Sequence, residues 1–291
     1  MAIKIQQTNK YIPRPKFMIY GDPGDGKTSL CSTVKTEGEK DILYAFTEGG
    51  VQTIAHLDLP YVDIRRPSDY TEFYEMLKNG KKEPGQLGIW VGNQFFRGII
   101  IDLFGHLVQM NLIDLVRDAK SKNADRDIDD PSEYEYKKIN FRMIRQINEL
   151  SALPLKYMGF TAYVERRVEQ KTGVLLESKP AFVGSKIWQS AAGAMDYVFR
   201  ISPPLNVKDA AKYRTLRTQP AQNIYAKARV PGVAGNLPLP AEIKYELGHT
   251  TLLRKVFDKM ESFITSQRKL DPQAAEPTEI TETVDEAGTV A

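Results

Sequence analysis

The sequence predicts an α/β protein with a mainly parallel β-sheet that is covered by helices on both faces. Two observations support this class. Short apolar runs alternate with amphipathic segments along most of the chain, as they do where each strand is followed by a covering helix. The first apolar run also leads directly into a glycine-rich loop of the kind that joins a strand to a helix. Apolar residues make up 42% of the 291 residues, which is enough for a sizeable core.

The glycine-rich loop is a complete phosphate-binding motif. Residues 21–28 read GDPGDGKT and match the pattern G-x-x-x-x-G-K-[ST]. The apolar run at 17–20 precedes it as a strand would, and residues 29–34 can open a helix. The glycines let successive backbone N–H groups point at the phosphates of a nucleotide. We therefore expect nucleotide contacts from Gly21, Asp22, Pro23, Gly24, Asp25, Gly26, Lys27, Thr28 and Ser29.

Two side chains of this loop have distinct expected roles. Lys27 would reach the β- and γ-phosphate oxygens, and Thr28 would place its hydroxyl on Mg²⁺. Asp22 and Asp25 are unusual neighbours for a polyanion. Because the loop binds through backbone donors, we expect both carboxylates to face solvent. The motif thus predicts binding of ATP with Mg²⁺.

The other elements follow from periodicity and end signals. The sequence predicts two capped helices, one opened by Ser68 and Asp69 and ended by Gly80, the other opened by the capping box Ser132-x-x-Glu135. The second runs to about residue 150. Further strands are expected at 41–46, 61–64, 97–102, 156–164 and 196–201, hairpin-like pieces at 213–218 and 224–230, and a last amphipathic helix at 253–264.

Two carboxylates end strands at the edge of the sheet where the phosphate loop lies. Asp102 follows a buried strand and is positioned to hold the metal ion through a bound water, as a Walker B aspartate does. Glu48 ends the strand after the phosphate-loop helix, where a carboxylate can orient and deprotonate the attacking water. The alternatives are a helix-capping role for Asp102 and a simple turn residue for Glu48.

These motifs together resemble the RecA-like P-loop ATPase core. The phosphate loop, Glu48 and Asp102 at strand ends, and the late pair Lys227-x-Arg229 carry the resemblance, which covers about residues 10–265. The chain is similar to the phage-encoded RecA-like single-strand annealing recombinases of the Sak group, in a phage AAA-type nucleotide-binding family. The resemblance implies a DNA-dependent ATPase that binds single-stranded DNA and forms a homo-oligomer, ring or filament, in the bacterial cytoplasm.

The resemblance also implies roles for individual residues. Glu48 would be the hydrolytic base, and Tyr163 would sense the γ-phosphate from the end of the strand after Asp102. RecA has an amide side chain at that place, and relatives often have histidine. Lys227 and Arg229 would reach the γ-phosphate of the neighbouring subunit. Residues two apart on a strand point to the same face, so the two cations should project together. An exposed strand with two ordinary charges is the alternative.

DNA contacts are expected from two loops that leave the sheet. The first, at 117–131, carries Arg117, Lys120, Lys122 and Arg126. The second, at 165–186, nets only +2, and a solvated loop is an equally open interpretation. Phe182 and Trp188 are possible base-stacking partners, with a core position as the alternative for Trp188. The DNA-binding residues expected in the second loop are Arg166, Arg167, Lys171, Lys179 and Lys186.

Charge is unevenly distributed. The net charge is +3, yet the stretch from Asp271 to Ala291 holds six acidic residues and no Lys or Arg, so the preceding 270 residues carry 3 + 6 = +9. We therefore expect an ATPase domain at 1–265 and a disordered acidic tail at 266–291. The tail either solubilises the protein or mimics nucleic acid, competing for a basic groove or recruiting a partner.

Cysteine content and hydropathy limit the cellular compartments in which the protein is expected. The single cysteine, Cys31, excludes an internal disulfide and predicts a small core residue in a reducing cytoplasm. No apolar run approaches the length of a membrane span, and no metal-ligand spacing joins the three histidines.

Besides the annealing recombinase, we consider a hexameric DNA motor and an ATP-gated module that loads a replication or recombination partner, such as a single-strand-binding protein, with little hydrolysis. A small-molecule kinase is a further possibility, but the sequence shows no Arg-rich segment of the kind that forms the lid of such kinases.

Overall fold

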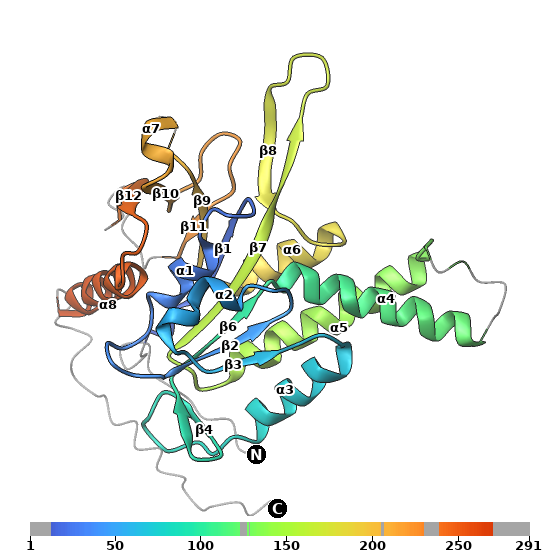
Figure 1. The fold of residues 1–291 in the computed structure, drawn as a ribbon, viewed down its shortest axis with the longest axis horizontal. Coiled ribbons are helices and arrows are strands. Elements are labelled where there is room, and N and C mark those ends of the chain that lie inside the picture. Colours follow the sequence, from blue (N-terminus) through green and yellow to red (C-terminus); the bar gives the residue numbers. More distant parts are fainter. Residues whose placement is uncertain (1–12, 123–126, 128, 205–206, 230–238, 270–291) are drawn as a thin grey trace, which may run out of the picture.

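The computed structural model describes residues 13–122, 127, 129–204, 207–229 and 239–269. Its core is a ten-stranded sheet with the main strand order β12-β10-β9-β1-β7-β6-β2-β3, and β11 and β8 pair with β9 and β7 (Figure 1). The strands are β1 (Lys16–Gly21), β2 (Ile42–Phe46), β3 (Tyr61–Asp63), β6 (Gly98–Asp102), β7 (Tyr157–Val168), β8 (Leu175–Pro180), β9 (Tyr197–Ser202), β10 (Tyr213–Arg217), β11 (Lys227–Ala228) and β12 (Glu242–Glu246). A separate small sheet pairs β4 (Ile89–Val91) with β5 (Gln94–Phe96).

Helices cover both faces of the sheet. Alternate residues of β1 enter different cores: Met18 and Tyr20 pack with α3 to α6, whereas Phe17 and Ile19 pack with α1, α2 and α8. This doubly covered, mainly parallel sheet confirms the predicted fold class. The helices are α1 (Lys27–Ser32), α2 (Val51–Ile54), η2 (Ala55–Leu57), α3 (Pro67–Asn79), α4 (Phe104–Lys122), α5 (Glu133–Ala152), α6 (Ser185–Ala194), α7 (Val207–Ala210) and α8 (Leu252–Lys269).

The parallel register brings the predicted site residues to one edge. β1 lies between β7 and β9, and Gly21 at its carboxyl end pairs with Tyr163 of β7. On the other side of β7, β6 pairs with β2 so that Asp102 lies beside Phe46. Glu48 follows Phe46 by two residues. The phosphate loop, Asp102, Tyr163 and Glu48 therefore meet at the carboxyl edge, where ligands of such sheets bind.

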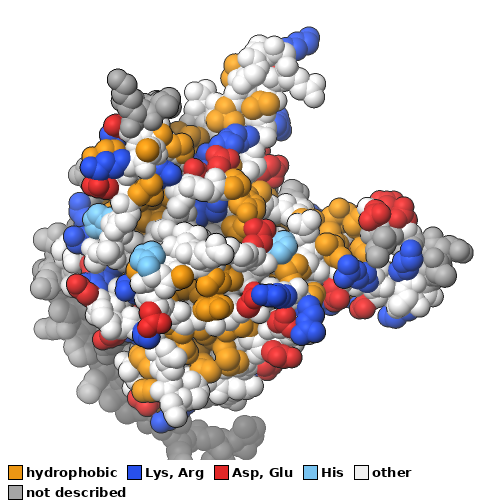
Figure 2. All heavy atoms as spheres, viewed as in Figure 1, with side chains coloured by type: hydrophobic (Ala, Val, Ile, Leu, Met, Phe, Trp, Pro, Cys, Tyr) orange, Lys and Arg blue, Asp and Glu red, His pale blue; other side chains and the backbone are white. Residues whose placement is uncertain are grey.

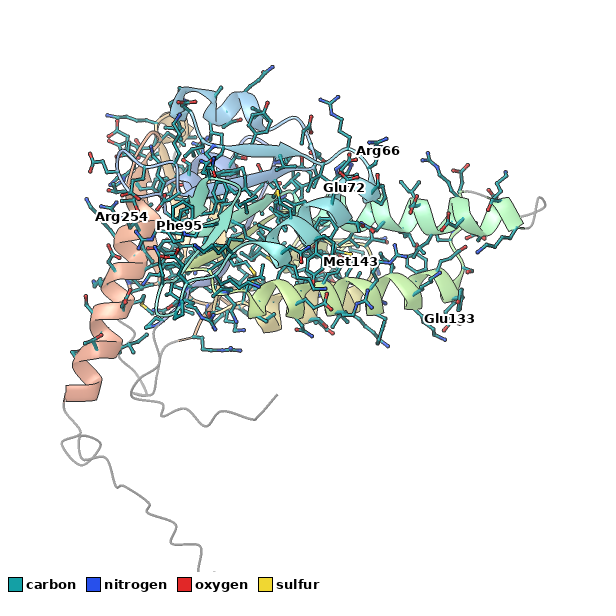
Figure 3. All side chains as sticks on the ribbon, turned by 90° about the horizontal axis from the view of Figure 1, so that it is seen from below. Arg66, Glu72, Phe95, Glu133, Met143 and Arg254 are labelled. Carbon is teal, nitrogen blue, oxygen red and sulfur yellow. The ribbon has the colours of Figure 1, made fainter. Side chains whose placement is uncertain are left out.

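Two structures project from this body. β7 continues to Val168 and pairs antiparallel with β8, so the segment expected as a loop at 165–186 is instead a β-hairpin followed by the start of α6. The hairpin reaches far from the sheet (Figure 1), and Figure 2 shows it standing out as a narrow arm. The second projection is the antiparallel pair of α4 and α5. Figure 3 shows these helices side by side, with Glu133 at the projecting end of α5.

The helix-end signals were largely correct. α5 begins after Ser132, whose backbone N–H donates to the Glu135 carboxylate at 2.6 Å, and the Glu135 N–H donates to the Ser132 hydroxyl at 3.4 Å. α3 ends before Gly80 as predicted, but it begins at Pro67 rather than at Ser68 and Asp69. Its Asp69 carboxylate accepts the Arg66 N–H at 2.9 Å from within the first turn. Asp69 therefore stabilises the helix start as a first-turn acceptor and not as the cap.

The C-terminal strands pair differently from the expected hairpin. The segments predicted at 213–218 and 224–230 contain β10 and β11, but these do not pair with each other. β10 pairs with β9 and β12, and β11 pairs with the first residues of β9. The last helix, α8, continues to Lys269. The acidic segment from Asp271 lies outside the described residues. No helix in the described part of the chain is both long and apolar enough to cross a membrane.

Candidate nucleotide-binding and catalytic site

The phosphate loop joins the end of β1 to the start of α1. Gly24 and Gly26 have φ angles of +81° and +91°, in the left-handed region that glycine adopts without strain. Gly21 is needed for space, because a Cβ there would lie 2.6 Å from the side chain and 2.8 Å from the carbonyl oxygen of Ile201. All three glycines of the motif thus have a backbone reason for their positions.

Lys27 lies within the loop. Its ammonium donates to the carbonyl oxygens of Gly21 at 3.2 Å and Asp22 at 2.8 Å, and it lies 4.7 Å from the centre of the Tyr163 ring. Burial lowers the pKa of Lys27 from its ordinary value, and the nearby carboxylates of Asp102, Asp25 and Asp22 oppose that shift. A partly desolvated cation in this place is suited to bind phosphate oxygens.

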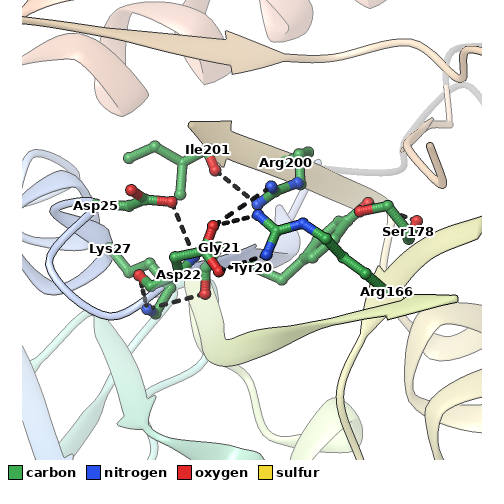
Figure 4. Close-up of polar contacts among 9 residues, drawn as sticks. All are labelled: Tyr20, Gly21, Asp22, Asp25, Lys27, Arg166, Ser178, Arg200 and Ile201. Atoms are coloured by element: carbon green, nitrogen blue, oxygen red, sulfur yellow. Dashed lines mark hydrogen bonds and ion pairs between the residues drawn. The ribbon is translucent and has the colours of Figure 1, made fainter. Parts of the chain in front are cut away.

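The prediction that Asp22 and Asp25 face solvent is wrong for Asp25, whereas the Asp22 side chain is 35% exposed but ion-paired. Asp25 is only 6% exposed, and its carboxylate accepts the backbone N–H of Asp22 at 2.8 Å. The Asp22 carboxylate lies between two guanidinium groups: Arg166 binds both of its oxygens, one at 2.8 Å, and Arg200 lies 3.7 Å away (Figure 4). The hydrogen bond from Arg166 lowers the pKa of Asp22. Both carboxylates are therefore parts of the loop's scaffold.

A third arginine supports the loop from β10. Arg214 donates from Nε to the Asp25 carbonyl oxygen at 3.0 Å and from Nη2 to the Gly24 carbonyl oxygen at 3.4 Å. Sequence analysis missed Arg200 and Arg214. They come from β9 and β10, about 180 residues after the loop, and no local motif marks them.

Asp102 forms the expected pair with Thr28. The Thr28 hydroxyl donates to one Asp102 oxygen at 2.6 Å, and the Thr161 hydroxyl donates to the other. Asp102 is 4% exposed, and burial raises its pKa although both hydrogen bonds lower it. A hydroxyl and a carboxylate adjacent to the phosphate loop are the oxygen ligands that Mg²⁺ takes beside a nucleotide. The residues present therefore fit Mg²⁺, with Thr28 and Asp102 as its protein ligands.

Glu48 lies on the same side and is held by Tyr163. The Tyr163 hydroxyl donates to the Glu48 carboxylate at 2.8 Å. Burial and the Glu48 charge raise the pKa of Tyr163 to about 12, so the hydroxyl stays protonated at neutral pH. His106 contacts the same segment, with Nδ1 2.7 Å from the Thr47 carbonyl oxygen and 3.9 Å from Glu48 Oε1. One tyrosine thus contacts both Lys27 and the candidate base.

Two pockets adjoin the phosphate loop. The first, of about 190 Å³, is lined by loop residues together with Glu48, Asp102 and Tyr163. The second, of about 390 Å³, lies along α1 and shares Gly24 with the first. Sequence analysis missed the second pocket because its walls come from distant segments. They include Ser29, Thr33, His56, Arg214, Tyr245, Leu247 and His249.

Lys227 and Arg229 lie together, as predicted from their spacing, but away from this chain's own nucleotide pocket. β11 pairs with Tyr197 and Val198, at the amino end of β9, whereas the phosphate loop is at the carboxyl edge. The Lys227 ammonium donates to the carbonyl oxygens of Ala192, Gly193 and Met195 at 2.7–3.2 Å. The 60% exposed side chain of Arg229 contacts the Gly193 carbonyl oxygen at 3.2 Å and Asp196 at 3.5 Å.

The basic residues predicted to bind DNA fall into two groups. Arg166 is bound to Asp22, and Lys179 lies 3.0 Å from Glu177 and 3.5 Å from Glu165. The other three are exposed and form no ion pair with a described residue: Arg167, Lys171 and Lys186.

The two candidate stacking residues are packed inward. Trp188 contacts the Tyr225 ring edge-on at 5.2 Å and Phe182 contacts Phe104 at 5.8 Å, so both pack against the core. In the first predicted DNA segment, Arg117, Lys120 and Lys122 are exposed in the last turns of α4, and Arg126 lies outside the described residues.

The fold and this site define a P-loop NTPase. Residues 14–230 match a family model described as an AAA domain (AAA_24), and the chain belongs to this family. Among solved structures, it is similar to the crystal structure of the RadB recombinase, with 14% identity over 70% of this chain and 80% of that chain and a TM-score of 0.36. A KaiC-like protein from Pyrococcus horikoshii OT3 has 9% identity, coverage of 70% and 79%, and a TM-score of 0.41. No curated protein matches the chain.

Family, fold and phosphate loop together make the chain a nucleotide-binding P-loop NTPase with an AAA domain. Proteins of this class use ATP with Mg²⁺.

Replacing Lys27 tests the phosphate loop. Lys27→Ala should weaken ATP binding by roughly 10- to 150-fold, because a charged hydrogen bond worth about 1.5–3 kcal/mol is lost. Titration with a fluorescent ATP analogue measures this. Lys40→Ala, an exposed lysine paired with Asp58 far from the loop, is the matched control. Equal affinity in both variants would contradict the assignment.

Replacing Tyr163 tests its hold on Glu48. Tyr163→Phe keeps the ring over Lys27 but removes the hydroxyl, so kcat for ATP should fall roughly 10-fold while KM changes little. Tyr163→His, which retains a donor, should keep more of the activity. Steady-state kinetics over a range of ATP concentrations measure both variants, and a wild-type kcat in Tyr163→Phe would show that the contact has no catalytic consequence.

Proposed function

We propose that the protein is a RecA-like ATPase that binds single-stranded DNA and promotes annealing or strand pairing in phage recombination, acting as a homo-oligomer in the bacterial cytoplasm. The observation that carries this proposal is the double role of β7. The strand contributes Tyr163 and Thr161 to the nucleotide site and then continues into the projecting hairpin. An arm that carries exposed cations and begins at the nucleotide site is the arrangement expected of an ATPase whose DNA contact depends on its nucleotide.

Each residue of the site has a separate role in ATP hydrolysis. Lys27 and the loop amides bind the phosphates, and Thr28 with Asp102 holds Mg²⁺, which when bound neutralises developing charge on the phosphates. Glu48 orients the attacking water and accepts its proton. The 390 Å³ pocket along α1 accommodates the nucleoside, whose base can stack on the rings that line it.

The hairpin supplies the strongest candidates for DNA contact within the predicted set. Arg167 and Lys171 are exposed on the arm, and Lys186 follows it at the start of α6. Arg166 differs from these because it is bound to Asp22 of the phosphate loop. We therefore assign Arg166 to the link between loop and arm, and Arg167, Lys171 and Lys186 to phosphate contacts.

The position of Lys227 and Arg229 supports action between subunits. Their edge of the sheet is opposite this chain's phosphate loop, so only the nucleotide of a neighbouring subunit is open to them. Lys227 also holds three carbonyl oxygens at the end of α6, whereas Arg229 is largely exposed. Arg229 is therefore the better candidate for the cation that reaches a neighbour's γ-phosphate.

One contact favours a second candidate function, an ATP-gated module that loads a partner and hydrolyses slowly. The Tyr163 hydroxyl binds one oxygen of the Glu48 carboxylate, which in this second function is thereby kept from orienting water. Tyr163→Phe would then raise kcat, whereas the first function predicts a fall. If that contact persists with ATP bound, ATP hydrolysis would be slow, and the ATP-bound protein would be the form that loads the partner. The two functions predict different rates of ATP turnover for the wild-type protein, fast in the first and slow in the second.

Glu48→Gln separates hydrolysis from binding. The amide cannot accept the proton, so single-strand-stimulated ATP turnover should fall roughly 10²-fold while ATP binding is retained. Glu37→Gln, an exposed carboxylate on the loop before β2, should behave as wild type. Turnover is followed by phosphate release with and without oligothymidylate, and annealing by fluorescence transfer between complementary strands. A wild-type protein that neither responds to single strands nor accelerates annealing would overturn the proposed function.

Arg229→Ala tests action across a subunit interface. The variant should bind ATP normally but hydrolyse it slowly, because removing an arginine finger costs up to several orders of magnitude in rate. Mixing it with Glu48→Gln should restore part of the activity, since some interfaces then pair an intact Glu48 with an intact Arg229. Lys227 is left in place because it caps α6. Proven co-assembly without recovery would exclude the shared site.

A further inference from the structure

One face of helix α5 is exposed and unusually aromatic. Tyr134 and Phe141 are 70% and 73% exposed, the highest values among the exposed large hydrophobic side chains described. Lys138 lies between them, four residues after Tyr134, and Arg145 follows Phe141, eleven residues after Tyr134. These spacings place all four residues on one side of the helix. We call Tyr134, Lys138, Phe141 and Arg145 the α5 stripe.

The opposite side of α5 explains why the stripe is not part of the core. Ile139, Met143 and Ile147 are at most 1% exposed and pack with the helices on that face of the sheet. The helix is therefore already anchored without Tyr134 or Phe141. Neither ring contacts another described aromatic ring, although exposed aromatic side chains are costly in water. The two rings are open to a ligand.

The two cations of the stripe are available as well. Lys138 forms no ion pair with a described residue, and Arg145 has only a long contact of 3.9 Å with Glu149. Lys137, next to the stripe, is paired with Glu133 at 2.7 Å. Exposed Asp129 and Asp130 precede α5, so an anionic ligand would be repelled beyond Tyr134. In Figure 2 basic and hydrophobic side chains occur together on the projecting helix pair, with acidic ones at its end.

We propose that the α5 stripe is a binding track for single-stranded nucleic acid, separate from the hairpin residues assigned above. Bases stack on Tyr134 and Phe141, and phosphates pair with Lys138 and Arg145. The stripe spans about 17 Å along the helix at 1.5 Å per residue, which is room for several nucleotides. Aromatic rings alternating with cations are the combination by which proteins hold single strands without reading their sequence. This inference rests on the proposed function for the identity of the ligand.

Charge argues against a second copy of α5 as the occupant. In an antiparallel two-fold pair centred on Phe141, Lys137 would face Arg145 and Glu133 would face Glu149. Like charges would meet on both sides of the stacked rings and oppose such a dimer. An anionic strand instead meets Lys138 between the rings and Arg145 after Phe141.

The test measures binding of a fluorescein-labelled oligothymidylate to the full-length protein by anisotropy. The variant Tyr134→Ala/Phe141→Ala should bind at least about 10-fold more weakly, since stacking on an aromatic ring contributes about 1–3 kcal/mol per base. Lys138→Ala should lower the slope of log affinity against log salt by roughly 0.7. Ile113→Ala, which removes a 41% exposed side chain from α4 outside the stripe, should leave binding unchanged.

Direct contact is read from Phe141→Trp, whose added fluorescence should be quenched by the oligonucleotide beyond the change seen with wild type. Unchanged affinity of the double alanine variant, with wild type binding tightly, would overturn the stripe and leave the proposed function intact. Failure of wild type to bind any single strand would overturn both. Loss of oligomer mass in the double variant, with unchanged affinity per subunit, would reassign the stripe to a protein interface and overturn the proposal.

Discussion

The buried carboxylate of Asp102 is the group on which the site depends. A nearly inaccessible carboxylate is costly, and its two oxygens are satisfied by hydroxyls from two different elements, Thr28 at the start of α1 and Thr161 in β7. These contacts fix the phosphate-loop helix against the strand that ends in Asp102, with β7 between β1 and β6. The same arrangement leaves a hydroxyl and a carboxylate beside the phosphates, so the interaction that orders the protein also prepares its metal ligands.

Around this centre, opposite charges hold the phosphate loop from outside. Arg166 and Arg200 bind Asp22, and Arg214 binds the loop's carbonyl oxygens. A loop that presents its N–H groups inward must satisfy its carbonyl oxygens on the outer side, and Arg214 of β10 donates to those of Gly24 and Asp25. Arg166 of β7 and Arg200 of β9 instead bind the Asp22 carboxylate. Asp22 and Asp25 are thus explained as acceptors within a scaffold, because the Asp22 carboxylate meets two guanidinium groups and the Asp25 carboxylate accepts a backbone N–H.

Local patterns predicted the parts of the site that a nearby motif or strand end marks. The phosphate loop has a fixed spacing, and Asp102 and Glu48 follow apolar strands, so the rule that parallel strand ends share an edge was sufficient. Arg200, Arg214 and the pocket along α1 could not be predicted, since they arise where strands distant in sequence meet. The hairpin from Glu165 to Lys179 was mistaken for a loop because its first strand is exposed on both faces at 165–168, which removes the alternation of apolar and polar residues that marks a half-buried strand.

The hairpin also connects distant parts of the molecule. Arg166 leaves the arm to bind Asp22, while Tyr163 lower in the same strand contacts Lys27 and Glu48. A ligand that moves the arm must therefore disturb contacts of the phosphate loop, and a nucleotide that draws Lys27 from its carbonyl partners must disturb β7. Such coupling is reciprocal, so if the arm binds a ligand as proposed, that ligand would change ATP affinity by the same free energy by which ATP changes the ligand's affinity. β7 is the physical path that makes this exchange possible, and Arg166 is its contact with the loop.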